Sequence, residues 1–228
     1  MDKMSLISIL TVAVPEAILN IYIGFVFTGQ RSKLYLDDKL NLIRMIATVS
    51  LMVVAAVVTR ATASDLITVL LINILLYSLI LFFVYRIKWY EAVISVMIFV
   101  GILITTEFAY MIQFFALLNI SLEEYLASDL NRFLISVPQR AIQIFIIASF
   151  WNWDIVYLNL QAHKKIRNLV LVCALVLGFT EALFYTLFMY SLDVLTPPFK
   201  IYYSIACMMF VVINVLLSRM IIAFSKRL

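Results

Sequence analysis

Four charged side chains interrupt stretches of apolar residues that otherwise suit the interior of a membrane: Glu16, Glu107, Arg140 and Glu181. A charge in hydrocarbon is costly, so such residues usually face the inside of a helix bundle and pair there. The chemistry open to them is ion pairing, proton exchange and the binding of a polar molecule. Their types and spacing supply neither a nucleophile with its base nor a set of metal ligands.

Amide and phenol side chains accompany these charges at helical spacing. Residues three or four apart lie on the same face of a helix, which groups each charge with its polar neighbours. The candidate ligand-binding residues are therefore Glu16, Asn20, Glu107, Tyr110, Gln113, Arg140, Gln143 and Glu181. Counted from the outer ends of the predicted helices, the four charges fall within a band of roughly 6 Å, in the outer half to the middle of the membrane.

Two interpretations of this polar group remain open. The simplest ion pairing sets Arg140 between Glu107 and Glu181, because an unpaired buried charge there would not be tolerated. In the first interpretation the charges pair only to fix helix packing. In the second they line a polar cavity, open to the outer face, that binds a ligand. The excess of acid over base favours a ligand, although a raised pKa on one glutamate would also remove the imbalance.

The elements that position these residues are apolar helices. The chain has 228 residues, of which 65% are hydrophobic and only 13% charged, with a mean hydropathy of +1.09. So few charges cannot cover a water-facing surface, whereas lipid can replace that polar shell. We predict an all-α, polytopic transmembrane helix bundle that forms a single domain over residues 1–228. The predicted helices span about 5–28, 40–59, 65–85, 91–119, 132–152, 169–191 and 199–224.

The basic residues predict the orientation of this bundle. With seven crossings, ten Lys and Arg residues fall on one side, in the segments after the first, third and fifth helices and at the C-terminus. The other side holds only Lys3, Arg60, Arg132 and Lys200. Cytoplasmic loops are enriched in Lys and Arg, so we expect the N-terminus outside and the C-terminus in the cytoplasm. The expected location is the cell membrane, and the lipid bilayer is the first partner.

No catalytic class has support in the sequence. The one Cys–His combination, His163 with Cys173, lies near an apolar run that would keep the thiol protonated and inert. Cys207 also lies in an apolar run, with no metal-ligand spacing around either cysteine. We expect no enzymatic activity, no cofactor, no bound metal and no nucleic-acid partner.

The opening SLISILTVAVPEAILNIYIGFVFTG, with Pro15 and Glu16, and the aromatic run Phe150-Trp151-Asn152-Trp153 before a basic loop resemble one family. This family is the membrane sensor half of AgrC-type peptide-pheromone histidine kinases of Gram-positive bacteria. The resemblance implies recognition of a small secreted peptide from the outer side, as in quorum sensing. The sequence ends at Leu228, after the seventh helix, so we expect a sensor without a kinase domain of its own. Such a sensor would signal through a partner, compete for a pheromone or assist peptide export.

Two functions follow as hypotheses. The first is a multi-pass membrane sensor or receptor-like protein that takes part in signal transduction, with its ligand site among the candidate residues. The second is a transport or accessory membrane subunit, in which the same charges line a solute or proton path. The sequence does not identify the ligand, the signalling partner or the oligomeric state.

Overall fold

A computed structural model describes residues 5–62, 66–118, 124–125, 128–151 and Thr180 of the chain, and these are helical, with no strand among them. A short helix and a π-helical turn open the chain and run directly into the first long helix. The elements are α1 (Leu6–Ser8), η1 (π turn, Ile9–Ala13), α2 (Val14–Phe27), η2 (3-10 turn, Arg31–Leu34), α3 (Lys39–Thr62), α4 (Leu66–Tyr85), α5 (Trp89–Leu118) and α7 (Asp129–Trp151).

The all-helical prediction is confirmed for the described residues. In the described part of the chain, four helices are long and apolar enough to cross a membrane: Leu6–Phe27, Lys39–Thr62, Thr68–Tyr85 and Asp129–Trp151. α5 follows the predicted fourth helix along its whole length and is apolar over Trp89–Ile104. The two remaining predicted helices, 169–191 and 199–224, lie outside the described residues.

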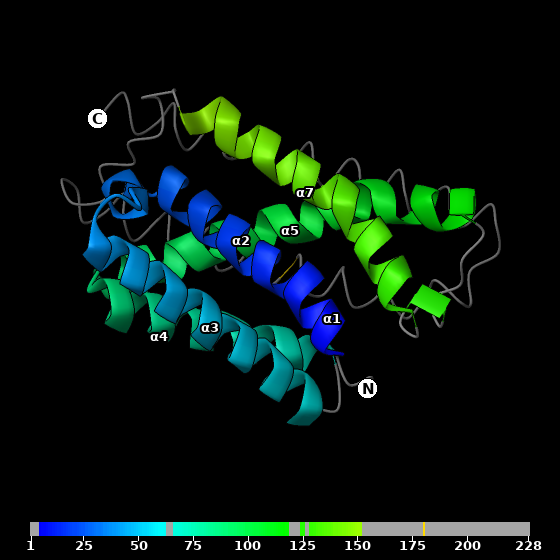
Figure 1. Ribbon diagram of the computed structural model, residues 1–228, viewed down its shortest axis with the longest axis horizontal. Coiled ribbons are helices and arrows are strands. Elements are labelled where there is room, and N and C mark those ends of the chain that lie inside the picture. Colours follow the sequence, from blue (N-terminus) through cyan, green and yellow to red (C-terminus); the bar gives the residue numbers. More distant parts are fainter. Residues whose placement is uncertain (1–4, 63–65, 119–123, 126–127, 152–179, 181–228) are drawn as a thin grey trace.

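The helix α2 occupies the centre of the described bundle, with α3 on one side and α7 on the other (Figure 1). α5 packs against α2, and α4 joins α3 and α5 into a continuous layer. α2 and α7 run parallel, because Ser5 bonds Asp129 at one end of the pair and Arg31 bonds the Phe150 carbonyl at the other. This arrangement makes α2 the helix that connects the α3–α4–α5 layer with α7.

An apolar core holds α2 against the α3–α4–α5 layer. The rings of Phe25 and Tyr85 are fully buried and meet edge to face, with their centroids 4.7 Å apart. The Tyr85 hydroxyl donates to the Met45 sulfur at 3.8 Å, so the phenol is satisfied inside the core. Aromatic pairs in this geometry contribute about 0.5–1.5 kcal/mol beyond the area they bury.

A close backbone approach fixes the contact between α2 and α5. A Cβ atom added to Gly24 would lie 3.0 Å from the Ser95 carbonyl oxygen and 3.1 Å from its Cβ. One turn later, the Thr28 and Ser95 hydroxyls are 3.0 Å apart, within hydrogen-bonding distance. Small residues allow helices to pack closely where no hydrophobic force drives association, as in lipid.

The outward faces of the helices are apolar. On α3 and α4 the most exposed large side chains include Ile43, Val54, Leu75 and Phe83, each more than half exposed. A water-facing helix would carry polar residues on that side. These faces are suited to contact with lipid, and Trp89 and Trp151 stand at helix ends as predicted for residues at a membrane interface.

Basic and aromatic groups close the end of the bundle at which α2 ends and α3 begins. The Lys33 ammonium donates to the Tyr85 carbonyl at 3.2 Å. Burial lowers the pKa of Lys33, the positive charge of Arg44 lowers it further, and Glu91 partly opposes both. Glu91 itself is buried and accepts hydrogen bonds from the Gln30 amide and the Lys88 backbone N–H, each at 3.2 Å.

Candidate functional site

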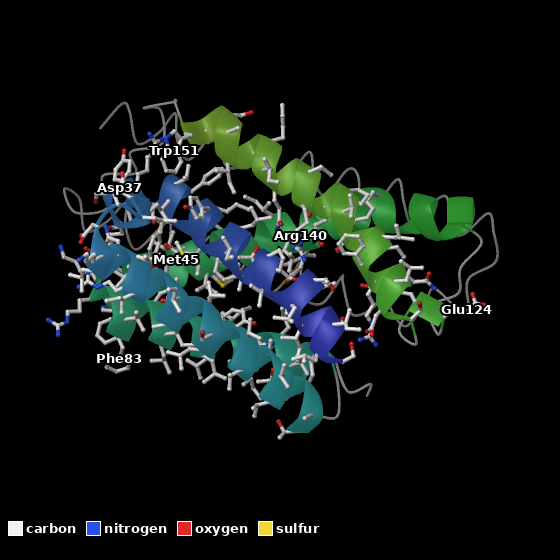
Figure 2. All side chains as sticks on the ribbon, viewed as in Figure 1. Asp37, Met45, Phe83, Glu124, Arg140 and Trp151 are labelled. Carbon is white, nitrogen blue, oxygen red and sulfur yellow. The ribbon has the colours of Figure 1, made fainter. Side chains whose placement is uncertain are left out.

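Arg140 lies at the centre of the candidate site, between α2 and α7 (Figure 2). Its Nη2 donates to the Val12 carbonyl at 3.0 Å and to Glu16 Oε2 at 3.3 Å, and its Nη1 donates to Gln143 Oε1 at 3.3 Å. The first two acceptors belong to the N-terminal helix and the third to α7 itself. One guanidinium therefore ties the backbone and a side chain of the N-terminal helix to α7.

The ion pair between Arg140 and Glu16 lies near the middle of both helices. The Arg140 side chain is 12% exposed and that of Glu16 is 30% exposed. α1, η1 and α2 form one continuous helix, Leu6–Phe27, in which Glu16 is the eleventh of 22 residues, and Arg140 is eleven residues after the start of α7. Because neither residue is near a helix end, the ion pair is not an ordinary surface salt bridge.

A second polar link continues the site one turn further along both helices. The Gln143 amide donates to Asn20 Oδ1 at 3.2 Å, and both side chains are buried. Arg140 and Asn20 thus occupy opposite ends of the Gln143 amide, one as donor to its oxygen and the other as acceptor from its nitrogen. These contacts orient the Gln143 side chain, because its amide oxygen and its amide nitrogen each have a set partner.

The backbone of the N-terminal helix is irregular where Arg140 meets it. Val14 donates its N–H to the Ile9 carbonyl, five residues earlier, which defines the π turn η1. Proline has no N–H, so Pro15 leaves an acceptor of the preceding turn without its helical donor. Single π turns occur often at functional sites. Here the widened turn presents the Val12 carbonyl to the guanidinium.

The helix α7 has a matching irregularity at Pro138, which lies inside the helix. The Tyr110 hydroxyl of α5 donates to the Ile135 carbonyl at 2.9 Å, in the turn that Pro138 weakens. The Gln139 amide lies 3.5 Å from the Leu103 carbonyl of α5. One side chain and one backbone carbonyl of α5 thus hold the weakened turn of α7.

The structure brings together five of the predicted site residues. Glu16, Asn20, Arg140 and Gln143 form one connected group, and Tyr110 contacts α7 one to two turns away. Arg140 pairs with Glu16, which was not part of the simplest ion pairing predicted from the sequence. The side chains of Glu107 and Gln113 and the whole of Glu181 lie outside the described residues. The expected pairing of Arg140 with Glu107 and Glu181 stays a prediction.

The sequence reasoning missed two partners in this region. The Val12 carbonyl is a backbone atom, which no residue pattern marks, although Pro15 indicates that a nearby carbonyl loses its donor. The Ser5 hydroxyl donates to Asp129 Oδ2 at 2.6 Å, where α1 meets the start of α7. Both residues were expected near the outer ends of helices, but nothing in the sequence paired them.

The described site offers groups for hydrogen bonding, ion pairing and proton exchange. Within the residues that the structure describes, no three His, Cys, Asp or Glu side chains lie close enough to hold a metal ion. The site offers one guanidinium, one carboxylate and two amides, which bind polar groups and exchange protons. Comparison with protein-family models, with curated proteins and with solved structures finds no match to this chain.

Proposed function

We propose that the protein is a multi-pass sensor of the cell membrane, receptor-like in its action, that recognises a small secreted peptide from the outer side and signals through a partner. The observation that carries this proposal is the position of Arg140. It joins α7 to α2 near the middle of both helices, and α2 also contacts α3 and α5. A ligand that competes for the guanidinium would therefore act on the helix that connects all the others.

The proposed signal is a change between two helix arrangements. A ligand shifts such an equilibrium only through a difference in affinity between the two states. The contacts of Arg140 with Val12 and Glu16 exist only while α2 and α7 are held together, so a ligand that replaces them favours separation. In the proposal, the two states differ in what the Arg140 guanidinium binds: Val12 and Glu16 in one state and the ligand in the other.

The proposed orientation follows from the basic residues. Arg31, Lys33, Arg86 and Lys88 belong to the connections after α2 and after α4. Because α2 and α4 both lead to this end, we assign it to the cytoplasm and the end with Ser5 and Asp129 to the outer face. Two further crossings, at 169–191 and 199–224, complete the proposed seven and bring the C-terminus to the cytoplasm.

The test is the thermal stability of the detergent-purified protein with a panel of cyclic and linear secreted peptides. A peptide whose free concentration is 100 times its Kd stabilises the folded state by about 2.7 kcal/mol, which shifts the melting temperature by several degrees. We expect that shift in the wild type, a smaller one in Arg140→Lys and none in Arg140→Gln. Lys39→Gln removes the same charge from an exposed site and serves as the control.

A panel that shifts neither the wild type nor Lys39→Gln would refute peptide sensing. Equal shifts in wild type and Arg140→Gln would place the peptide elsewhere. The two Arg140 variants must first be shown to fold, by a monodisperse gel-filtration profile and an unchanged far-ultraviolet circular dichroism spectrum.

The second candidate function is a transport or accessory subunit. Glu16 favours it, because this carboxylate is 30% exposed although it stands near the middle of an apolar helix. A carboxylate of that kind can carry a proton or contact a solute. Uptake of a labelled solute, or proton flux, in reconstituted vesicles separates the two functions. Flux that is lost in Glu16→Gln would favour transport over sensing.

A further inference from the structure

Polar residues follow one stripe on each of the two parallel helices. On the N-terminal helix the stripe runs at steps of three or four residues, and α7 repeats that spacing, as expected for a single helix face. The polar seam, as we call the two stripes together, consists of Ser5, Ser8, the Val12 carbonyl, Glu16 and Asn20 on one side and Asp129, Arg132, Ser136, Arg140 and Gln143 on the other.

Contacts join the two sides of the seam along its length. Ser5 bonds Asp129 at the outer end, Arg140 bonds Val12 and Glu16 in the middle, and Gln143 bonds Asn20 one turn further. Between the first two contacts lie Ser8, Arg132 and Ser136, each less than a tenth exposed. The seam therefore extends from the outer end of the helix pair past Arg140 to Asn20 and Gln143, and in the structure it is closed.

Two polar atoms inside the closed seam have no hydrogen-bond partner among the described residues: the Ser8 hydroxyl and Arg140 Nε. Both atoms are buried, and the Ser8 side chain is fully so. A buried polar group without a partner costs about 1–3 kcal/mol, and more in hydrocarbon. The closed packing is thus not the arrangement that satisfies this seam best.

Both helices are easiest to bend beside the seam. The π turn η1 and Pro15 lie between Ser8 and Glu16, and Pro138 lies between Ser136 and Arg140. Sharp helix bends occur at prolines and π turns, because the backbone hydrogen bonds there are already reduced. The outer part of the helix pair can therefore move while the inner part stays packed.

The inner part of the helix pair is closed by aromatic rings. Phe27 and Phe150 have centroids 4.7 Å apart, and Tyr22 lies 6.3 Å from Trp151. Between Asn20 and Gln143 and the inner end of the helix pair, the described residues of α2 and α7 form no further side-chain hydrogen bond with each other. The seam thus ends inside the helix pair, as a binding cleft does and a through-channel does not.

We infer that the polar seam is the closed form of a cleft that opens to the outer aqueous phase and takes a carboxylate group of its ligand onto Arg140. This inference rests on the proposed function for the identity of the site and adds its route of access and the ligand group it takes. Nε and Nη2 form the edge of a guanidinium that pairs with a carboxylate through two parallel bonds. Among the residues that the structure describes, Nε has no partner in the closed form, and Nη2 is shared between Val12 and Glu16.

Cysteine accessibility tests the route. Cys173 and Cys207, the two native cysteines, are first replaced by alanine. Single cysteines then replace Ser8 and Ser136 in the seam, and replace their immediate neighbours Ile7 and Val137, which are 63% and 46% exposed on the outward faces. Only a thiolate reacts with methanethiosulfonates, and a thiol in lipid stays protonated. We expect membrane-impermeant reagents to modify the two seam cysteines and to leave the two neighbours unmodified.

The ligand group is tested by comparing two reagents of opposite charge at Ser136→Cys. Rates are measured with 2-carboxyethyl and with 2-trimethylammonioethyl methanethiosulfonate, and their ratio reports the local charge. Arg140→Gln should lower the carboxylate-to-ammonium ratio by roughly tenfold, the effect of one charge about one helical turn away in a partly hydrated site. Lys39→Gln should leave the ratio unchanged.

Seam cysteines that react no faster than their lipid-facing neighbours would overturn the cleft. A rate ratio that is unchanged in Arg140→Gln would overturn the carboxylate assignment. Ser136→Cys keeps the test decisive if Ser8→Cys fails to fold. If the seam cysteines are modified but no peptide stabilises the protein, the cleft is supported and peptide sensing is rejected. If a peptide stabilises the protein but the seam cysteines are not modified, peptide sensing is supported and the cleft is rejected.

Discussion

The ion pair between Arg140 and Glu16 gives a quantitative test of the packing between α2 and α7. The perturbation is Arg140→Met, which keeps an unbranched side chain and removes the charge. It deprives Val12, Glu16 and Gln143 of their donor. Removing one partner of a buried ion pair costs about 3–5 kcal/mol, whereas hydrogen bonds within membranes average about 0.6 kcal/mol.

The structure decides between these two magnitudes. Three bonds at the membrane average give a lower bound of roughly 2 kcal/mol. The full cost of a buried pair does not apply, because the Glu16 side chain is 30% exposed and the ion pair is therefore only partly buried. We therefore expect Arg140→Met to lower the free energy of unfolding by about 2–4 kcal/mol.

The assay is equilibrium unfolding in mixed micelles, applied as a double-mutant cycle with Glu16→Gln. In the double variant no charge is stranded, so its loss should be smaller than the sum of the single losses by about 1 kcal/mol or more. Lys39→Gln, at an exposed site, should lose less than about 0.5 kcal/mol. A coupling energy near zero would refute the reasoning, because the two side chains would then not stabilise each other.

Three further predictions test other contacts of the described bundle. Gly24→Ala should destabilise the protein by about 1–3 kcal/mol in the same unfolding assay, because its Cβ would lie 3.0 Å from the Ser95 carbonyl oxygen, and Ala61→Val on an exposed face should not. Tyr110→Phe should lower the free energy of unfolding by about 0.5–1.5 kcal/mol, because the hydrogen bond to the Ile135 carbonyl is lost. Tyr22→Phe is the comparison, and an equal loss of stability in the two variants would contradict this role of Tyr110. The pKa of Lys33 is lowered in the folded state, so the unfolded state binds more protons between that lowered pKa and 10.5, and stability should rise with pH across this window relative to Lys33→Gln. Parallel stability curves for wild type and Lys33→Gln between pH 8 and 10.5 would show that Lys33 does not titrate as inferred.

The location of Arg140 unites the sensing proposal and the cleft. A contact between two helices at mid-length is a natural switch, because its loss changes the relation of whole helices rather than of one loop. The Ser5–Asp129 contact and the aromatic rings around Trp151 stand at opposite ends of the same helix pair. In the proposed cleft, the end with Ser5 and Asp129 moves about η1 and Pro138, while the end with the aromatic rings stays packed.

The sequence by itself predicted the helices that the structure describes and four of the polar side chains that meet between α2 and α7. Apolar stretches of about 20 residues that are bounded by charges have one solution in lipid, since a helix satisfies all of its backbone groups internally. For the same reason Glu16, Asn20, Arg140 and Gln143 had to face the bundle interior, and helical spacing set them on shared faces. These inferences need only local geometry and the cost of burying polar groups.

Only the tertiary structure decided which groups meet. From the sequence, three glutamates were possible partners of Arg140, and the parallel packing of α2 and α7 places its guanidinium beside Glu16. The Val12 carbonyl is available because η1 widens the helix, and Ser5 meets Asp129 because the two helices start at the same end. Pairing between helices depends on their relative direction, rotation and height. Those quantities arise from packing over the whole interface, and the period of one helix does not contain them.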